Sequence, residues 1–233
     1  YGTGCFALTN TGTDIIKSEN GLLTTIAYQI EGEDPLYALE GSVPIAGAAV
    51  QWLRDNLNII KSSDEIESLA MGEKDNGDVY FVPAFSGLFS PHWDETARGA
   101  LFGLTRFSNK SHIARSVLES VAFQSFELLQ SMEKDLNIEF QNLKVDGGMV
   151  SNNLLMQFQS DILNKTIISQ EINEITALGA GVASFIFAEN LNIESVGDFI
   201  STFKTWNPNM SNETRENLLT SWFKAIEKSK NWL

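Results

Sequence analysis

The chain has 233 residues, of which 43% are apolar and 20% are charged, a composition typical of a globular protein with a buried core. Its 30 acidic and 16 basic side chains give a net charge of −14, which disfavours binding to nucleic acid or to an anionic membrane surface. A single cysteine excludes an internal disulfide, two histidines disfavour a histidine-rich metal site, and no apolar run reaches the roughly 18 residues of a membrane-spanning helix.

Three strands are predicted in the first part of the chain, where runs rich in strand-forming residues alternate with turn signals. They cover residues 5–10, 22–30 and 36–40. Apolar residues then recur at helical spacing, which predicts an amphipathic helix over about residues 42–58. A second helix is expected to begin in the segment 62–65, where two serines precede two acidic residues.

The rest of the chain predicts strands that alternate with helices. A buried strand at 78–85 and a short one at 100–104 flank a loop that is dense in Gly, Pro and aromatic residues. The later elements are helix 112–135, strand 140–145, helix 151–163, strand 166–169, helix 177–189 and a tail helix at 213–232.

The order of these elements is βββα, an insertion at about residues 62–138, and then βαβα. This βββαβαβα order predicts an α/β domain with a mixed sheet and a helical insertion, of the RNase H-like class that includes actin-type ATPase domains. No repeat or linker divides the chain, so residues 1–233 are expected to form one domain. Because the chain opens with Tyr1 in an already patterned segment, we expect it to be part of a longer protein with an N-terminal domain before it.

Two glycine-bearing turns carry the clearest chemical signals. The first, Tyr1-Gly2-Thr3-Gly4, stands just before a predicted strand. Glycines let backbone N–H groups approach an anion closely, and the Thr3 hydroxyl adds a donor, so the turn suits a nucleotide phosphate. A plain tight turn has the same residue pattern, and this alternative stays open on the motif alone.

The second turn lies in the segment VDGGMVSNN at 145–153, where Gly147 and Gly148 follow a strand and a helix is expected to start at Ser151. Ligands bind α/β folds at such strand-to-helix turns, and a helix N-terminus favours negative charge. No Gly-Lys-Ser/Thr sequence follows, so this is not a Walker motif. The alternative is a glycine pair that only closes the connection.

Other residues give weaker signals. Gly47 and Gln51 share one face of the predicted helix at 42–58 and can border a ligand there, although a helix-packing glycine is the alternative. Cys5 is expected to be a small core residue, and the loop residue His92 a packing or surface residue. The acidic residues at 64–67 are expected to form a solvated face.

Nine segments, in the same order, resemble the C-terminal half of the glycerol kinases, a branch of the FGGY carbohydrate kinases. They include YGTGCF at 1–6, AGAAVQWLRDNL at 46–57, ARGALFGLTR at 97–106, VDGGMVSNN at 145–153 and TALGAG at 176–181. The resemblance extends over essentially the whole chain. It implies two RNase H-like domains, the other being the N-terminal domain of the same protein, with ATP in the cleft between them.

The resemblance also assigns site residues. It places ATP or ADP against Thr3, Gly47, Gln51, Gly148, Met149 and Asn152. Thr3 is expected at the phosphates, the residues in 148–152 at the adenosine end, and the ring of Phe6 against the carbon side of glycerol. The general base and the acids associated with Mg²⁺ are expected in the N-terminal domain, so no catalytic or metal-binding residue is expected in this chain.

The implied activity is transfer of the γ-phosphoryl group of ATP to glycerol, giving glycerol 3-phosphate and ADP. The resemblance implies a cytoplasmic enzyme that forms a homo-oligomer at full length, and this chain alone is expected to be inactive. Two alternatives remain: another FGGY sugar kinase, such as a pentulose kinase, or a non-catalytic actin-like binding module. The aromatic Phe6 favours glycerol, and the retained nucleotide turns argue against the non-catalytic module.

Overall fold

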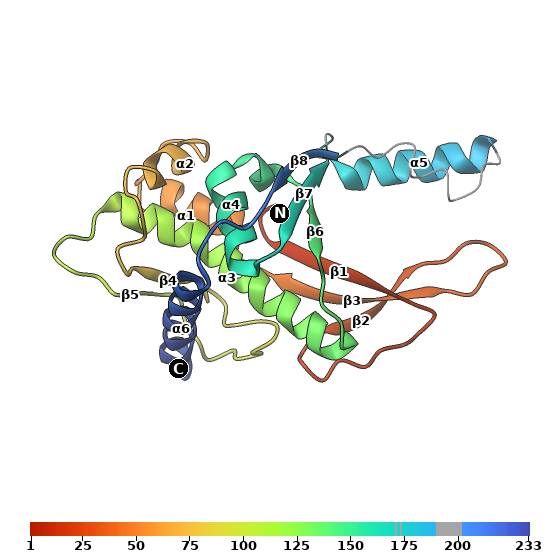
Figure 1. The fold of residues 1–233 in the computed structure, drawn as a ribbon, viewed down its shortest axis with the longest axis horizontal. Helices are drawn as coiled ribbons and strands as arrows, with labels where there is room; N and C mark the ends of the chain where they lie inside the picture. The colour runs from red at the N-terminus through yellow and green to blue at the C-terminus, as the bar shows by residue number, and fades with distance from the viewer. Residues whose placement is uncertain (171, 173, 190–201) are drawn as a thin grey trace.

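The computed structural model describes residues 1–170, 172, 174–189 and 202–233 (Figure 1). In chain order its elements are β1 (Cys5–Gly12), β2 (Leu23–Tyr28), β3 (Leu36–Val43), α1 (Gly47–Asp55), α2 (Glu65–Ala70), β4 (Tyr80–Val82), β5 (Ala100–Phe102), α3 (Lys110–Leu136), β6 (Asn142–Val145), a 3₁₀ helix (Gly148–Ser151), α4 (Asn153–Leu163), β7 (Thr166–Gln170), α5 (Ile175–Glu189), β8 (Thr202–Trp206) and α6 (Asn212–Ser229). Every predicted strand and helix is present, and β8 is an additional strand.

The first three strands form an antiparallel sheet in the order β1-β3-β2. Residues alternate between its two faces, and the face that carries Cys5, Leu39 and Gly41 is buried. A Cβ atom on Gly41 would lie 2.8 Å from a methyl group of Leu128 on α3, so this sheet packs closely on the central helix.

The second half of the chain contributes a mixed sheet in the order β6-β7-β8. β6 and β7 are parallel, with α4 as the crossover helix between them, whereas β8 is antiparallel to β7. The sequence did not predict β8, although its Trp206 is buried. The β4–β5 hairpin forms a third, two-stranded sheet.

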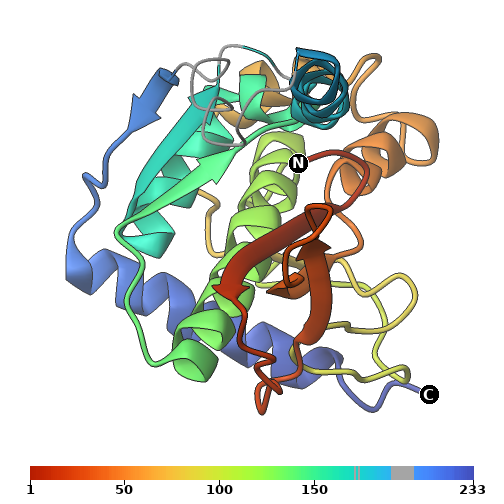
Figure 2. The same cartoon turned by 90° about the vertical axis from the view of Figure 1, so that its right-hand side faces the viewer.

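Helix α3 is the central element of the fold. It packs against β1 and β3 of the first sheet and against α1, α2 and α4, and Figure 2 shows it running through the middle of the molecule. Its first turn is capped by Asn109, whose side chain accepts hydrogen bonds from the backbone N–H groups of Ser111 and His112. It ends at Asn137, which adopts the left-handed conformation that asparagine tolerates well. The helix is therefore longer at both ends than the predicted 112–135.

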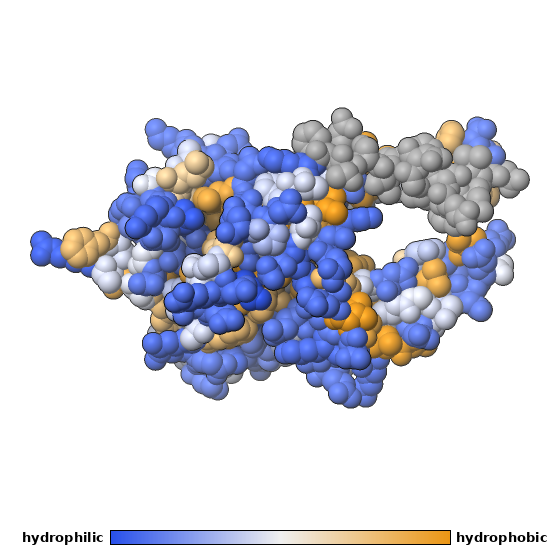
Figure 3. All heavy atoms as spheres, viewed as in Figure 1, coloured by the Kyte–Doolittle hydropathy of each residue, from blue (hydrophilic) through white to orange (hydrophobic). Residues whose placement is uncertain are grey.

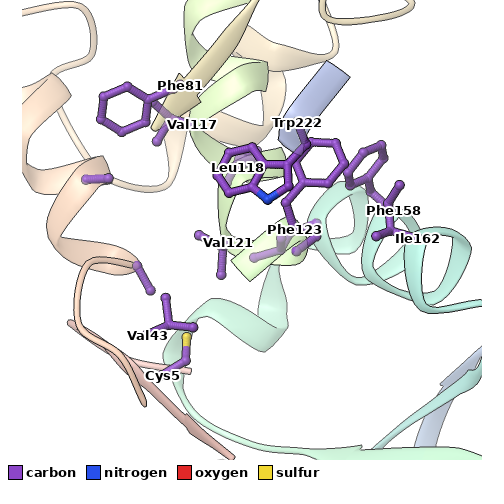
Figure 4. Packing of buried hydrophobic residues seen from close by; sticks show 14 of the residues in the cluster. Cys5, Val43, Phe81, Val117, Leu118, Val121, Phe123, Phe158, Ile162 and Trp222 are labelled. Atoms are coloured by element: carbon purple, nitrogen blue, oxygen red, sulfur yellow. The ribbon is translucent and has the colours of Figure 1, made fainter. Parts of the chain in front are cut away.

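An aromatic cluster joins α3 to the C-terminal helices (Figure 4). The rings of Phe123 and Trp222 stack with centroids 5.0 Å apart, and Phe158 meets Phe123 edge-on at 5.4 Å. Such pairs add about 0.5–1.5 kcal/mol beyond the burial of their area. They fix α4 and α6 against α3.

Several predicted boundaries were wrong for local reasons. Strand β3 continues to Val43, so α1 begins at Gly47 instead of residue 42. The helix expected from Ser151 is preceded by the 3₁₀ turn and begins at Asn153. The strand predicted at 78–85 is only three residues long, because Pro83 cannot donate a further ladder hydrogen bond.

A buried polar cluster holds the segment before β4 to α3. Glu119 is only 4% exposed and accepts hydrogen bonds from Arg115 Nε and Asn76 Nδ2, both at 2.9 Å. Arg115 also donates to the backbone carbonyl of Glu73 at 2.9 Å. Burial raises the pKa of Glu119 from 4.5 to about 7, although Arg115 and Asn76 both favour its ionised form.

This pKa predicts a specific pH dependence of stability. Between about pH 4.5 and pH 7 the folded protein binds more protons at Glu119 than the unfolded chain does, so the stability contributed by Glu119 falls as the pH rises through this window. Relative to the Glu119→Gln variant, the parent should therefore lose unfolding free energy across the window and show a constant difference above it. Urea unfolding at a series of pH values measures this, with the exposed Glu65→Gln as control. A difference that does not change with pH would mean that Arg115 keeps Glu119 ionised throughout.

Candidate active-site cavity

A cavity of about 350 Å³ lies where the Tyr1–Gly4 turn, α1, α2 and the turn after β6 meet. Its lining includes all six residues predicted to contact the nucleotide: Thr3, Gly47, Gln51, Gly148, Met149 and Asn152. Phe6, predicted to contact the substrate, does not line it. Segments that are far apart in the sequence are thus brought to one site.

The Tyr1–Gly4 turn is bonded to the start of α1 through the backbone. The N–H groups of Ala46 and Ala48 donate to the Thr3 carbonyl at 3.0 Å, and that of Gly47 donates to the Gly2 carbonyl at 2.9 Å. These carbonyls satisfy the free N–H groups of the first helical turn in place of a side-chain cap. A Cβ atom on Gly47 would lie 2.6 Å from the Gly2 oxygen. Gly47 is therefore required for close packing, as in the helix-packing alternative, although it also lines the cavity.

The same turn is bonded to the segment after β6. The Met149 N–H donates to the Tyr1 carbonyl at 3.2 Å, and the Tyr1 hydroxyl donates to Gln159 on α4 at 3.0 Å. Gly147 has a φ of 94°, and a Cβ atom there would lie 2.5 Å from the Tyr1 oxygen. Both the conformation and the close approach thus require glycine at position 147.

Gly148 is in a different situation from its neighbour. It is the first residue of the 3₁₀ helix, its φ is not positive, and a Cβ atom added to it would meet no other atom within 4 Å. Because Gly148 lines the cavity, a larger side chain at this position can enter the cavity without straining the backbone.

Asn152 has a structural role as well as a place in the cavity. Its side-chain oxygen accepts a hydrogen bond from the Leu155 N–H at 2.9 Å and so caps α4. The amide nitrogen of its side chain makes no hydrogen bond within the described part of the chain. That nitrogen is available as a donor to a molecule in the cavity.

Four polar residues of the cavity were not among the predicted site residues: Ser63, Asp64, Glu67 and Ser151. The acids at 64–67 were expected to form a solvated face. Asp64 and Glu65 are indeed exposed, whereas Glu67 is half-buried, and Asp64 and Glu67, three residues apart, both line the cavity. Glu67 Oε1 accepts a hydrogen bond from the Leu154 N–H at 2.9 Å. The negative charge expected at the N-terminus of α4 is therefore supplied by the protein itself. Their i, i+3 spacing was the only sequence signal.

Phe6 lies on the exposed face of the β1–β3 sheet, outside the cavity. Its side chain is 65% exposed, and Leu8 and Leu23 on the same face are 60% and 56% exposed. Figure 3 shows hydrophobic residues gathered over this sheet, whereas most of the surface in that view is hydrophilic.

Other candidate chemistries find little support. Within the described ranges no three His, Cys, Asp or Glu side chains are grouped so that they could hold a metal ion, and the helices there are too short or too polar to cross a membrane. Cys5 is a buried core residue, and burial raises the pKa of its thiol to about 11. A thiol with so high a pKa is a poor nucleophile. His92 pairs with Glu127 at 2.7 Å and holds its loop to α3.

Comparison with known proteins supports a single family. Residues 1–187 match the sequence model of the C-terminal domain of the FGGY family of carbohydrate kinases. The chain is 52% identical to a glycerol kinase of Brucella anthropi and 51% identical to one of Methylobacterium radiotolerans, in each case over the whole chain. These alignments cover 47% and 46% of the relatives, so the chain spans about half their length.

Solved structures agree with this result. The glycerol kinase of Plasmodium falciparum, solved with ADP, superposes on 98% of the chain and 46% of its own length, with a TM-score of 0.90 and 38% identity. A gluconate kinase from Lactobacillus acidophilus, covered over 46% of its length, shares the fold over 97% of the chain at a TM-score of 0.81 and 22% identity. The predicted actin-type fold class is confirmed, and the chain belongs to the FGGY family of carbohydrate kinases, whose C-terminal domain it contains.

Proposed function

We propose that the cavity binds ATP and ADP, and that the whole protein transfers the γ-phosphoryl group of ATP to glycerol. The observation that carries the proposal is the meeting in one cavity of about 350 Å³ of Thr3 and Gly148, which belong to the two predicted turns, and Asn152, which the resemblance assigned to the nucleotide. Support also comes from the glycerol kinase of P. falciparum, a similar protein that was solved with ADP.

We infer that this chain supplies one wall of the active site. Phosphoryl transfer depends mainly on positioning and on stabilisation of the developing charge, and both need groups around the phosphates. The described residues of the cavity include no histidine, lysine or arginine. We propose, on the family resemblance, that the general base, the acids that accompany Mg²⁺ and most groups that hold glycerol belong to the N-terminal domain.

The proposed domain organisation follows from this division. Residues 1–233 are taken as one C-terminal domain with an insertion at about 62–138, and Phe6 faces the domain that precedes it. Exposed apolar residues beside Phe6 fit a sheet face that another domain covers. We further propose that the full-length protein is a cytoplasmic homo-oligomer, a proposal that rests on the family resemblance.

A substrate screen tests the proposed activity. Full-length protein should consume ATP when glycerol is present and not when it is absent, and glycerol should be a better acceptor than pentuloses or gluconate. Faster turnover with a pentulose would identify another FGGY sugar kinase. No turnover with any acceptor would favour a non-catalytic nucleotide-binding module.

The Thr3 hydroxyl provides a first test of the site. In the full-length enzyme, Thr3→Val keeps the shape of the side chain and removes a donor from the phosphate region. Loss of a preorganised donor typically lowers kcat by roughly 10²–10³. Because Thr3 is exposed and other donors share the charge, we expect a smaller decrease of about 10–100-fold, with little change in the KM for glycerol.

Steady-state kinetics measure this effect, and Thr25→Val on β2, outside the cavity, is a matched control. If Thr3→Val leaves kcat unchanged, Thr3 serves only the turn and its assigned role is wrong.

The glycine pair gives a second test. Gly148→Leu should place its side chain in the cavity and raise the KM for ATP by at least about tenfold, while leaving thermal stability close to that of the parent. Gly148→Ala adds one methyl group in open space and should change little. Gly147→Ala should instead lower stability by about 1–3 kcal/mol, because that residue has a positive φ and touches Tyr1.

Kinetics and thermal unfolding of the three variants separate a blocked cavity from a strained turn. A stably folded Gly148→Leu enzyme with an unchanged KM for ATP would show that the nucleotide does not bind in this cavity.

A further inference from the structure

The charges around the cavity are arranged unevenly. Asp64 and Glu67 project from the α2 side, whereas the Tyr1–Gly4 turn presents a hydroxyl and glycine backbone. No lysine, arginine or histidine is among the described lining residues that could neutralise the two carboxylates. The triphosphate of ATP carries several negative charges, and like charges at close range repel strongly in a partly desolvated site. A bound nucleotide therefore has a preferred orientation, with its phosphates at Thr3 and its nucleoside at α2.

Glu67 is built to accept hydrogen bonds on this side. Its Oε1 atom accepts a hydrogen bond from the Leu154 N–H at 2.9 Å, in the first turn of α4. Its Oε2 atom makes no hydrogen bond with any described residue. Asp64 precedes α2 and its side chain forms no capping hydrogen bond. The residue is exposed, and it also lines the cavity.

We propose that Glu67, assisted by Asp64, accepts a hydrogen bond from the nucleoside of the bound nucleotide. The donor is a ribose hydroxyl or the amino group of the adenine base, because these are the nucleoside groups that a carboxylate recognises. These two acids thereby select the nucleoside and exclude the phosphates from the α2 side. The inference rests on the proposed function, since it requires that the cavity binds a nucleotide.

The test measures separately how the protein binds the nucleoside and the triphosphate parts of ATP. Binding of adenosine, and separately of tripolyphosphate, is measured by calorimetry on the full-length protein and on Glu67→Gln. The glutamine keeps an oxygen for the Leu154 N–H but loses the charge. Adenosine affinity should fall about tenfold, the usual worth of a hydrogen bond to a charged group. Tripolyphosphate affinity should stay the same or rise.

Two further variants complete the design. Glu65→Gln, an exposed glutamate on the same helix and outside the cavity, should change neither affinity. Asp64→Asn, whose side chain supports no other element, should lower adenosine affinity about threefold and gives a second measurement if Glu67→Gln does not fold. Unchanged adenosine affinity in both acid variants, or tighter tripolyphosphate binding without loss of adenosine, would overturn the proposal.

Analogues identify the donor. Inosine lacks the amino group, and 2′,3′-dideoxyadenosine lacks the ribose hydroxyls at positions 2′ and 3′. The analogue without the recognised donor should bind the parent and Glu67→Gln equally. If both analogues still distinguish the two proteins, Glu67 accepts neither donor and the proposal is wrong.

The Gly148→Leu variant shows which hypothesis has failed. If it binds ATP and adenosine like the parent, the cavity is not the nucleotide site and the proposed function fails with this inference. If it loses both ligands while Glu67→Gln and Asp64→Asn keep full adenosine affinity, the cavity binds nucleotide and only the role of the acids is wrong.

Discussion

The cavity depends on close backbone contacts that the Tyr1–Gly4 turn makes with two other segments, the start of α1 and the residues after β6. Gly47 approaches the carbonyl of Gly2 on one side, and Gly147 approaches that of Tyr1 on the other, both too closely for a side chain. Hydrogen bonds from Gly47 and Met149 fix these contacts. The turn therefore sets the distance between α1 and the segment after β6. Backbone contacts therefore hold these two segments to the turn.

These contacts divide the glycines of the site into two kinds. Gly47 and Gly147 hold the walls together, whereas Gly148 faces open space and keeps the cavity clear. The two acidic residues on the α2 side, Asp64 and Glu67, make one side of the cavity negatively charged. Glu67 supplies the negative charge at the start of α4, and the proposed phosphate position is therefore at the opposite side, near Thr3. Glycines that look alike in the sequence therefore have different roles in the structure.

Sequence patterns predicted most elements and both turns, because strand, helix and turn signals are local. They did not predict β8, whose place beside β7 is set by tertiary pairing across the sheet. Nor could they separate Gly147 from Gly148, because the two differ in their backbone conformation and in their distance from Tyr1, which only the folded structure shows. The place of Glu67 was missed for a related reason: Asp64 and Glu65 beside it are exposed as predicted, and only the packing of α4 against α2 makes Glu67 half-buried. The resemblance to the glycerol kinases predicted six residues that contact the nucleotide, and the fold brings all six to one cavity.

Hydrogen–deuterium exchange of the full-length protein, with and without ADP, tests most directly whether this cavity is the nucleotide site. The account predicts that ADP slows exchange of backbone N–H groups in the Tyr1–Gly4 turn, in residues 147–152 and in α2, while the β4–β5 hairpin and α6 are unchanged. Protection that leaves residues 147–152 and α2 unaffected, despite saturating ADP, would contradict it and place the nucleotide elsewhere.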